Sequence, residues 1–155
     1  MNELVAKLAA LNADYVRAID DDRLEDWPEF FVEQCLYRIT TADNHARGMQ
    51  AALIHADTRD MLRDRVVALR KAAVYERQRY RHVVGMSAQV SPRDGPLRAE
   101  TPFLVVRIVR DGAMELFASG RYLDELVEEG GTLKFRERLV VCDSSRIDTL
   151  LALPL

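Results

Sequence analysis

The amino-acid sequence predicts an α+β fold in which N-terminal helices pack on a curved antiparallel sheet. Apolar residues recur every three to four positions through much of the first half of the chain, and later at every second position. The change falls within residues 57–90, DTRDMLRDRVVALRKAAVYERQRYRHVVGMSAQV. After it come the hairpin-type turn signals Pro92-Arg93-Asp94-Gly95-Pro96, Asp111-Gly112 and Gly130-Gly131. Helices that close one side of a curled sheet produce a cone with a pocket.

Length and composition indicate an ordinary globular protein. A chain of 155 residues is expected to form one domain, 1–155, with 48% apolar and 30% charged residues. The net charge is −3 and the charges are interspersed, which argues against nucleic acid or an anionic membrane as a partner. Short apolar runs and the start Met1-Asn2-Glu3 predict no membrane span and no signal peptide, hence a cytoplasmic protein. In that compartment Cys35 and Cys142 should be reduced and buried rather than paired.

Two helices are predicted at the start of the chain. One face of the first steps by three and four residues and consists of Leu4, Leu8, Leu11, Tyr15 and Ile19. This helix ends in the acidic turn Asp20-Asp21-Asp22. A short second helix is predicted from Leu24 to Phe31, with Pro28 in its first turn, where a missing N–H costs little. Its aromatic residues should pack under the first helix.

The next segments alternate between strand and irregular patterns. Residues 34–41 alternate with period 2 and predict a strand that can pair at an edge of the sheet. Residues 42–49 are polar, contain a glycine and are expected to form a loop. Residues 50–55 are ambiguous and would fit a single helical turn.

The segment 57–90 is expected to join a helix to a strand. Asp57 or Thr58 can cap a helix that runs to about residue 73. Its buried face is predicted to be Leu62, Val66, Leu69 and Ala73. Beyond Arg79 the period becomes 2, and one face of the resulting strand would contain Tyr80, His82, Val84, Met86, Ala88 and Val90.

Three further strands are predicted over 101–110, 114–122 and 133–142. Together with the strand after Arg79 they would form an antiparallel meander. Strict alternation in the last strand puts Glu137 among apolar residues on one face, with Lys134, Arg136 and Arg138 on the other. The apolar ending 147–155 is expected to dock against protein, because a solvated tail of this composition would be a liability.

The sequence offers no recognisable metal or phosphate motif. It has three histidines and two cysteines, without the spacing of a zinc or iron–sulfur site. An iron site could be drawn from His45, His55 and Asp57, but no helical pair would preorganise it. The glycine pairs lie in turns between strands and precede no helix, so they are not phosphate cradles.

Acid–base chemistry in a cone is the alternative that remains open from the residues. Tyr15, Tyr37, His82 and Glu137 could face inward, and a buried carboxyl would have a raised pKa and could act as a base. The structural interpretation is that Glu137 pairs with an arginine on a neighbouring strand, such as 107 or 121. His82 would then be a core or interface residue.

Several segments, in their order and spacing, carry a family resemblance. They are IDDDRLEDWPEFFVEQCLYRIT, RDMLRDRVVALR, ERQRYRHVVG, TPFLVVRI, ELFASGRYLDEL and RERLVVCDSSRIDTLLALPL. Through them the chain resembles the small (β) subunits of Rieske-type aromatic-ring-hydroxylating dioxygenases over almost its whole length. The segments DNHARG, YRHVVG and CDSSRIDTLLALPL are most similar to members that act on aromatic carboxylates, which favours terephthalate as the substrate.

The resemblance implies a nuclear-transport-factor-2-like (cystatin-like) cone that carries no catalytic residue, cofactor or metal ligand of its own. A large α subunit would hold a Rieske 2Fe–2S cluster and a mononuclear non-haem iron, in an α3β3 hexamer with β–β contacts. A separate NAD(P)H reductase would supply electrons. The alternative function is a free-standing cone-fold isomerase or dehydratase, or a small-molecule binding protein.

Subunit contacts are predicted in three places. Arginines spaced by two, as in the segment 77–82, give a strand one basic face, which is either solvated, ion-paired or part of an interface. The loop 43–49 and the tail 147–155 are the other candidates, although the tail could instead complete the core of its own subunit. The interface candidates are Arg77, Arg79, Arg81, His82, His45, Arg47, Leu150, Leu151, Leu153 and Leu155.

Overall fold

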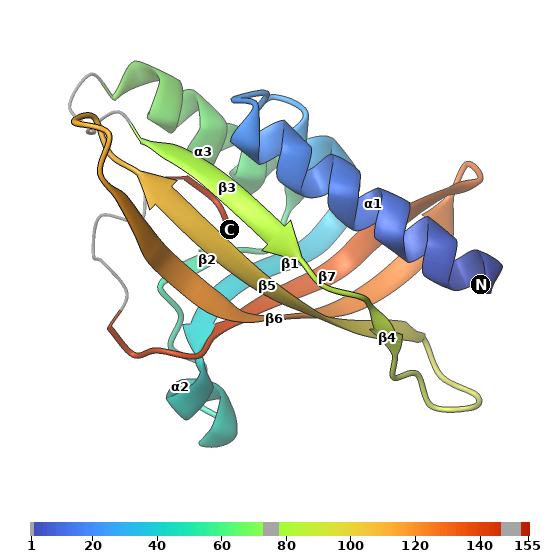
Figure 1. The fold of residues 1–155 in the computed structure, drawn as a ribbon. Coiled ribbons are helices and arrows are strands. Elements are labelled where there is room, and N and C mark those ends of the chain that lie inside the picture. Colours follow the sequence, from blue (N-terminus) through green and yellow to red (C-terminus); the bar gives the residue numbers. More distant parts are fainter. Residues whose placement is uncertain (1, 73–77, 147–152) are drawn as a thin grey trace.

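A computed structural model describes residues 2–72, 78–146 and 153–155 of the chain. Its helices are α1 (Glu3–Asp20), the 3₁₀ turn η1 (Trp27–Phe30), α2 (Ala42–Ala46) and α3 (Arg59–Lys71). Its strands are β1 (Phe31–Thr41), β2 (Ile54–Ala56), β3 (Arg79–Val84), β4 (Ala88–Gln89), β5 (Leu97–Ile108), β6 (Met114–Glu129) and β7 (Thr132–Cys142). The strands form one curled sheet, and α1 and α3 lie over its inner face (Figure 1). This arrangement confirms the predicted α+β cone.

The sheet is mixed, which corrects the prediction of an antiparallel sheet. Its strand order is β2-β1-β7-β6-β5-β3, with β4 pairing with β5. The strands β3, β5, β6 and β7 form the expected antiparallel meander. However, β1 pairs with β7 in parallel, and β2 covers the other side of β1, so β1 is not at the edge. An alternating sequence pattern fixes neither strand direction nor neighbour, because both depend on where the chain returns.

The two long helices bury the faces predicted for them, and α3 begins at one of the two caps predicted for it. The side chain of Asn2 caps α1 by accepting the Leu4 N–H, and that of Thr58 caps α3 by accepting the Met61 N–H. The face of α1 that includes Tyr15 is buried against the sheet. The buried residues of α3 are Leu62, Val66 and Leu69, and Ala73 lies outside the described residues.

Several short segments differ from the prediction. The expected loop 42–49 begins with the five-residue helix α2, because the Thr41 hydroxyl caps it at the Asn44 N–H. The ambiguous segment 50–55 ends in the edge strand β2 rather than a helical turn. The predicted helix 24–31 is reduced to η1, with Pro28 in its first turn as expected.

The strand after Arg79 is also shorter than its alternating pattern. It stops at Val84, and the next residue, Gly85, lies so close to the ring of Pro102 that a Cβ there would be 2.7 Å from Pro102 Cγ. Beyond this break Met86 is 79% exposed, so the predicted face of Tyr80 and His82 does not continue to it. None of the described helices is long and apolar enough to cross a bilayer.

Candidate functional site

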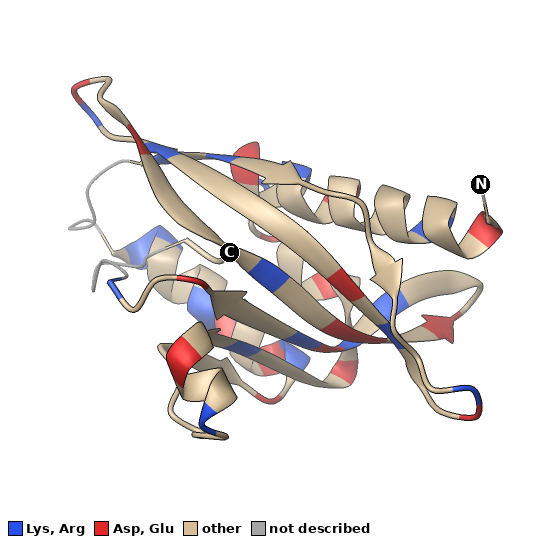
Figure 2. Ribbon diagram, turned by 60° about the horizontal axis from the view of Figure 1, so that its bottom comes forward, with Lys and Arg blue, Asp and Glu red and all other residues tan. Residues whose placement is uncertain are grey.

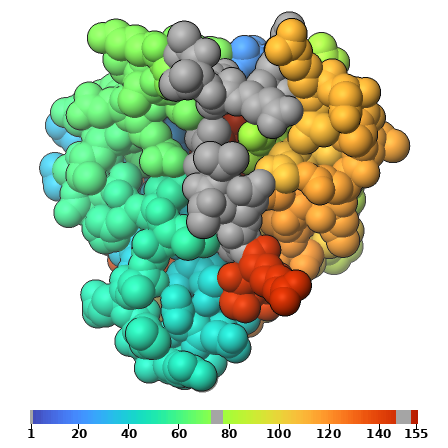
Figure 3. All heavy atoms as spheres, turned by 90° about the vertical axis from the view of Figure 1, so that its left-hand side faces the viewer, coloured from blue at the N-terminus to red at the C-terminus, as the bar shows by residue number. Residues whose placement is uncertain are grey.

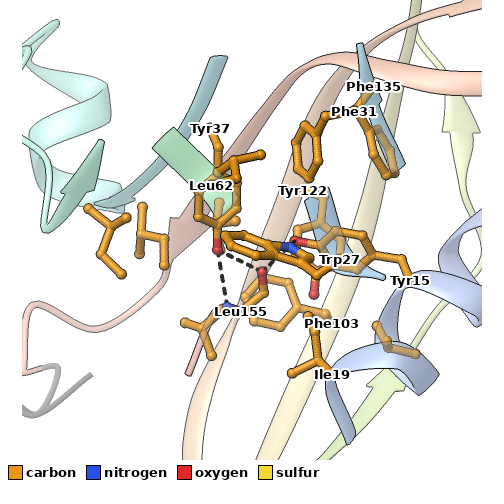
Figure 4. Packing of buried hydrophobic residues seen from close by; sticks show 14 of the residues in the cluster. Tyr15, Ile19, Trp27, Phe31, Tyr37, Leu62, Phe103, Tyr122, Phe135 and Leu155 are labelled. Atoms are coloured by element: carbon orange, nitrogen blue, oxygen red, sulfur yellow. Dashed lines mark hydrogen bonds between the residues drawn. The ribbon is translucent and has the colours of Figure 1, made fainter. Parts of the chain in front are cut away.

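The inside of the cone is filled by a hydrogen-bonded aromatic core. Figure 4 shows Tyr15 from α1, Trp27 from η1 and Tyr37 from β1 converging on the main chain of Leu155. The Trp27 indole donates to the Tyr15 hydroxyl at 3.0 Å, and both tyrosine hydroxyls donate to the Leu155 main-chain oxygen at 2.9 Å. The Leu155 N–H donates back to the Tyr37 hydroxyl at 3.1 Å. Each of these polar atoms therefore finds its partner within the chain, and the two tyrosines are fully buried.

Burial also removes the phenols from acid–base chemistry near neutral pH. Burial raises the pKa of Tyr15 and raises that of Tyr37 and Tyr122 well above the ordinary value for a tyrosine. All three hydroxyls consequently stay protonated, and those of Tyr15 and Tyr37 act as donors within the core.

A buried ion pair lies beside this aromatic core. Arg138 of β7 donates from Nε and Nη2 to the two carboxylate oxygens of Asp124 on β6, each at 2.8 Å, and also bonds Asn12 of α1. Its guanidinium carbon lies 3.8 Å from the ring centre of Tyr122 and 4.3 Å from that of Tyr15. Burial raises the pKa of Asp124 while the Arg138 cation lowers it. Burial alone would lower the pKa of Arg138, but the Asp124 carboxylate raises it, so the arginine stays charged.

The Arg138 position corrects the sequence analysis, which placed Arg138 outside and Glu137 inside. The pairing of β6 with β7 shifts register between Glu125 and Leu126, which face Glu137 and Phe135. Two residues of β7 therefore lie opposite one residue of β6. This bulge places the side chains that follow it on the opposite face of the sheet from the one that strict alternation predicts. Glu137 is exposed and Arg138 is fully buried.

A second buried polar pair joins α1 to the edge strand β3. Asp20 accepts the His82 main-chain N–H at 2.8 Å and its ring Nδ1 at 2.7 Å. The side chains of both residues are at most 2% exposed. The carboxylate thus satisfies one donor on the open edge of the sheet, so His82 has a structural role that the acidic turn at residue 20 did not suggest.

The catalytic set considered from the sequence does not come together. Tyr15 and Tyr37 meet at Leu155, whereas His82 binds Asp20 and Glu137 faces outward. The arginines suggested as partners of Glu137 have other partners: Arg107 pairs with Glu115, and Arg121 with Glu100.

The predicted interface residues lie in different environments. Arg79 and Arg81 are exposed on β3. His45, within α2, is half-buried, and Arg47, just after α2, is exposed. Leu153 and Leu155 are buried in the core of this chain, in line with the alternative that the tail completes its own subunit. Arg77, Leu150 and Leu151 lie outside the described residues.

Side chains suited to hold a metal do not gather in the described part of the chain. Nowhere among those residues do three histidine, cysteine or carboxylate side chains come together as a metal site requires, and His45, His55 and Asp57 form no such group. The residues present therefore do not fit an iron centre or an iron–sulfur cluster.

The functionally interesting residues that the sequence did not identify are the buried charges. They are Asp20, Asp124 and Arg138, together with the uncharged Asn12, and Asp124 lies beyond the end of the strand predicted over 114–122. Asn12 interrupts an otherwise apolar helix face one residue after Leu11, and this is the one local signal that was available.

The chain is similar to known proteins in both sequence and structure. A family model described as "Ring hydroxylating beta subunit" matches residues 15–149. The terephthalate 1,2-dioxygenase terminal oxygenase component subunit beta 1 of Comamonas sp is 48% identical over 155 residues, which are 100% of this chain and 99% of that protein. The anthranilate 1,2-dioxygenase small subunit of Burkholderia cepacia is 39% identical over 141 residues, 91% of this chain and 88% of its own length.

A solved structure also matches. The β subunit of a candidate aromatic-ring-hydroxylating dioxygenase from Novosphingobium aromaticivorans superposes with a TM-score of 0.89 at 36% identity. The match covers 98% of this chain and 97% of the other. The expected cone fold and the expected resemblance are both confirmed by these findings.

Proposed function

The chain belongs to the ring-hydroxylating dioxygenase β-subunit family, and from this membership we propose that it is a non-catalytic subunit that supports assembly of a Rieske non-haem iron dioxygenase. Its partner is a large α subunit, and the assembly is an α3β3 hexamer with β–β contacts. A free-standing isomerase, dehydratase or small-molecule binding protein is not favoured.

The observation that carries this proposal is the filled cone. Tyr15, Trp27 and Tyr37 occupy the interior and satisfy one another and Leu155, where an enzyme of this shape would need an open pocket. The residues described provide no group fit to hold iron. The Rieske 2Fe–2S cluster and the mononuclear iron are accordingly assigned to the α subunit, which receives electrons from a separate NAD(P)H reductase.

The substrate assigned to the complete enzyme is terephthalate, which it would cis-dihydroxylate in aromatic catabolism. The support is the name of the relative that is 48% identical over the full chain. A dicarboxylate would be bound by cationic groups of the α subunit. Among the described residues of this chain, Arg138 is the only fully buried cation, and it is already paired with Asp124. The protein would act in the cytoplasm as a single domain, 1–155, without nucleic acid or membrane.

Co-expression with its Rieske-bearing α subunit tests the assembly role. A tag on this chain should recover one complex with equal amounts of both subunits, and native mass spectrometry should give the mass of α3β3. Iron analysis should find the metal only in the complex. A stable monomer that ignores the α subunit would contradict the proposal.

The substrate is tested separately with that complex. Adding reductase and NADH should give oxygen uptake that depends on terephthalate, with benzoate and anthranilate as matched aromatic acids. Faster turnover of either control acid would remove terephthalate as the substrate while leaving the assembly role intact.

A further inference from the structure

The last three residues of the chain lie inside the cone rather than on its surface. Leu153 is 6% exposed and Leu155 is fully buried, although residues 153–155 belong to no helix or strand. The mark for this end falls within the outline of the molecule in Figure 1 and again, after a turn of 60°, in Figure 2. Buried main-chain groups need partners, and side chains of the core provide them for Leu155.

Leu155 is bound through both of its main-chain groups. Its oxygen accepts the hydroxyls of Tyr15 and Tyr37, each at 2.9 Å, and its N–H donates to the Tyr37 hydroxyl at 3.1 Å. The Tyr37 hydroxyl therefore binds an acceptor and a donor of the same residue. A simple carboxylic acid has no N–H, so this arrangement fits an N-acylated amino acid. The side chain of Leu155 packs in the buried apolar cluster, which fits leucine.

The walls around Leu155 are held by contacts that do not involve the tail. The Trp27 indole donates to the Tyr15 hydroxyl at 3.0 Å. The Tyr15 ring centre lies 6.2 Å from that of Phe31 and 5.6 Å from that of Phe135. The Tyr37 ring centre lies 5.2 Å from that of Trp27 and 5.8 Å from that of Phe31. Without the tail these rings would stay in place, and two buried hydroxyls would lack their acceptor.

The tail can be reached from solvent. A hollow of about 450 Å³ lies between the end of α1 and the start of β3, and Leu153 lines it together with Ile19 and Tyr80. Leu153 is only two residues from Leu155, so solvent approaches the buried end without any opening of the sheet. The interior beyond the hollow is apolar with two convergent hydroxyls, a composition typical of sites for small ligands.

We propose that the cone contains a binding site for an N-acylated leucine, such as the end of a peptide, and that the chain's own Leu155 fills it as an intrachain ligand. The hydroxyls of Tyr15 and Tyr37 bind the oxygen of the ligand, and Tyr37 also accepts its N–H. The tail closes a pocket that the rest of the fold builds. This inference does not involve the α subunit, so its failure would leave the proposed assembly role unchanged.

The test separates the tail from the folded protein. A protease site inserted after Arg146, which is exposed, lets the full chain fold first and then be cut. In Figure 3 the segment that follows β7 (red) lies on the surface, where a protease can reach it. A labelled peptide of residues 147–155, IDTLLALPL, is then titrated into the cut chain. Trp27 is the only tryptophan and donates to Tyr15, so its fluorescence reports on the occupied site.

The peptide should bind to the cut chain and restore the melting temperature of the uncut chain. N-acetyl-L-leucine should displace the peptide. The matched acid, 4-methylpentanoic acid, has the same side chain and carboxyl group but no amide N–H. It should need an about tenfold higher concentration, close to the contribution of one hydrogen bond.

Substitution of the tyrosines tests the same bonds from the side of the protein. Tyr37→Phe should weaken binding of the peptide about tenfold or more, because the variant loses both bonds to Leu155. Tyr122→Phe is the matched control and should bind the peptide like the unsubstituted chain. Tyr122 is equally buried, but its hydroxyl makes no hydrogen bond with any described residue.

Three results would overturn the inference. A cut chain that stays unfolded with the peptide present shows that the tail is part of the folding core and not a ligand. A folded cut chain that never takes up the labelled peptide shows that the tail fills no exchangeable site. Equal displacement by the two acids shows that the site does not recognise the N–H. Should Tyr37→Phe fold poorly, competition between the two acids in the unsubstituted cut chain decides alone.

Discussion

At the scale of single residues, the buried ion pair of Arg138 and Asp124 distinguishes this core from an ordinary apolar one. Three hydrogen bonds tie the guanidinium to Asp124 and Asn12, and aromatic rings cover its faces. Such a pair adds little net stability relative to apolar residues, yet removing one member leaves a charge without a partner in a low-dielectric interior.

Replacing Arg138 by methionine should therefore lower the free energy of unfolding by about 3–5 kcal/mol. The double variant Arg138→Met, Asp124→Leu should recover much of that loss, because no charge then stays buried alone. Denaturant unfolding of both variants and of Asp124→Leu completes the cycle. Equal stability of the single and double variants would contradict this account of the pair.

The two thiols are a second feature at this scale. Burial raises the pKa of Cys35 to about 11 and that of Cys142 to about 12, and both cysteines are free, as the sequence predicted. Thiolate is the reactive form, so little of either residue can react at neutral pH.

In the native protein at pH 7, Cys35 should react with a disulfide reagent roughly 100-fold more slowly than in the unfolded chain and Cys142 roughly 1,000-fold more slowly, since each unit of raised pKa removes tenfold of the thiolate. Absorbance of the released reagent product, with and without denaturant, measures this. Rapid native reaction of either thiol would show that its segment opens.

At the scale of elements, Arg70 of α3 clamps the turn between α1 and η1. Its side chain donates to both carboxylate oxygens and the main-chain oxygen of Asp22, at 2.7–2.9 Å, and to Glu25 at 2.8 and 3.0 Å. Asp22 has a φ of 59°, a left-handed conformation that aspartate tolerates better than most residues. The clamp thus holds α3 against the turn between α1 and η1, which lies more than thirty residues earlier in the chain.

Glu25→Gln should lower stability at pH 7 by about 0.5–1 kcal/mol, the upper range for an exposed ion pair. Hydrogen bonds from Arg70 lower the pKa of Glu25 from 4.5 to about 2 in the folded protein. Because the folded value lies below the unfolded one, this contribution is complete above about 4.5 and disappears as the pH falls toward 2.

The difference in melting between the unsubstituted chain and Glu25→Gln should accordingly shrink between those two pH values. Glu33→Gln, an exposed glutamate on β1, is the matched control. A difference that stays constant down to pH 2 would rule out the clamp as its cause.

At the scale of the whole molecule, one core connects every layer. Tyr15, Trp27, Tyr37 and Leu155 belong to α1, η1, β1 and the end of the chain, and the buried cluster continues through the meander. Unfolding should therefore be a single transition in which Trp27 fluorescence and far-UV circular dichroism coincide. Separate midpoints would contradict the prediction of one domain.

Local patterns were sufficient for most of the elements. The spacing of Leu8, Leu11, Tyr15 and Ile19 predicts α1, Thr58 marks the start of α3, and the two glycine turns after residue 110 separate the strands of the meander. These signals are local because helix period, capping and turn conformation depend on residues only a few positions apart.

The sequence predicted less well which individual side chains of the cone are buried and which are exposed. The bulge in β7 reverses the exposure of Glu137 and Arg138, although their alternation in sequence is regular. A bulge depends on how two strands meet, so one strand's own sequence does not reveal it.

The sequence by itself determined the family, the α+β class and the order of helices and hairpins, because these depend on local periodicity and on residues shared along the whole chain. Only the tertiary structure decided that β1 runs parallel to β7, that the cone is filled around Leu155, and that Arg138 rather than Glu137 is buried. Each of these depends on contacts between segments far apart in the chain, and side-chain packing across such distances is what local patterns do not specify.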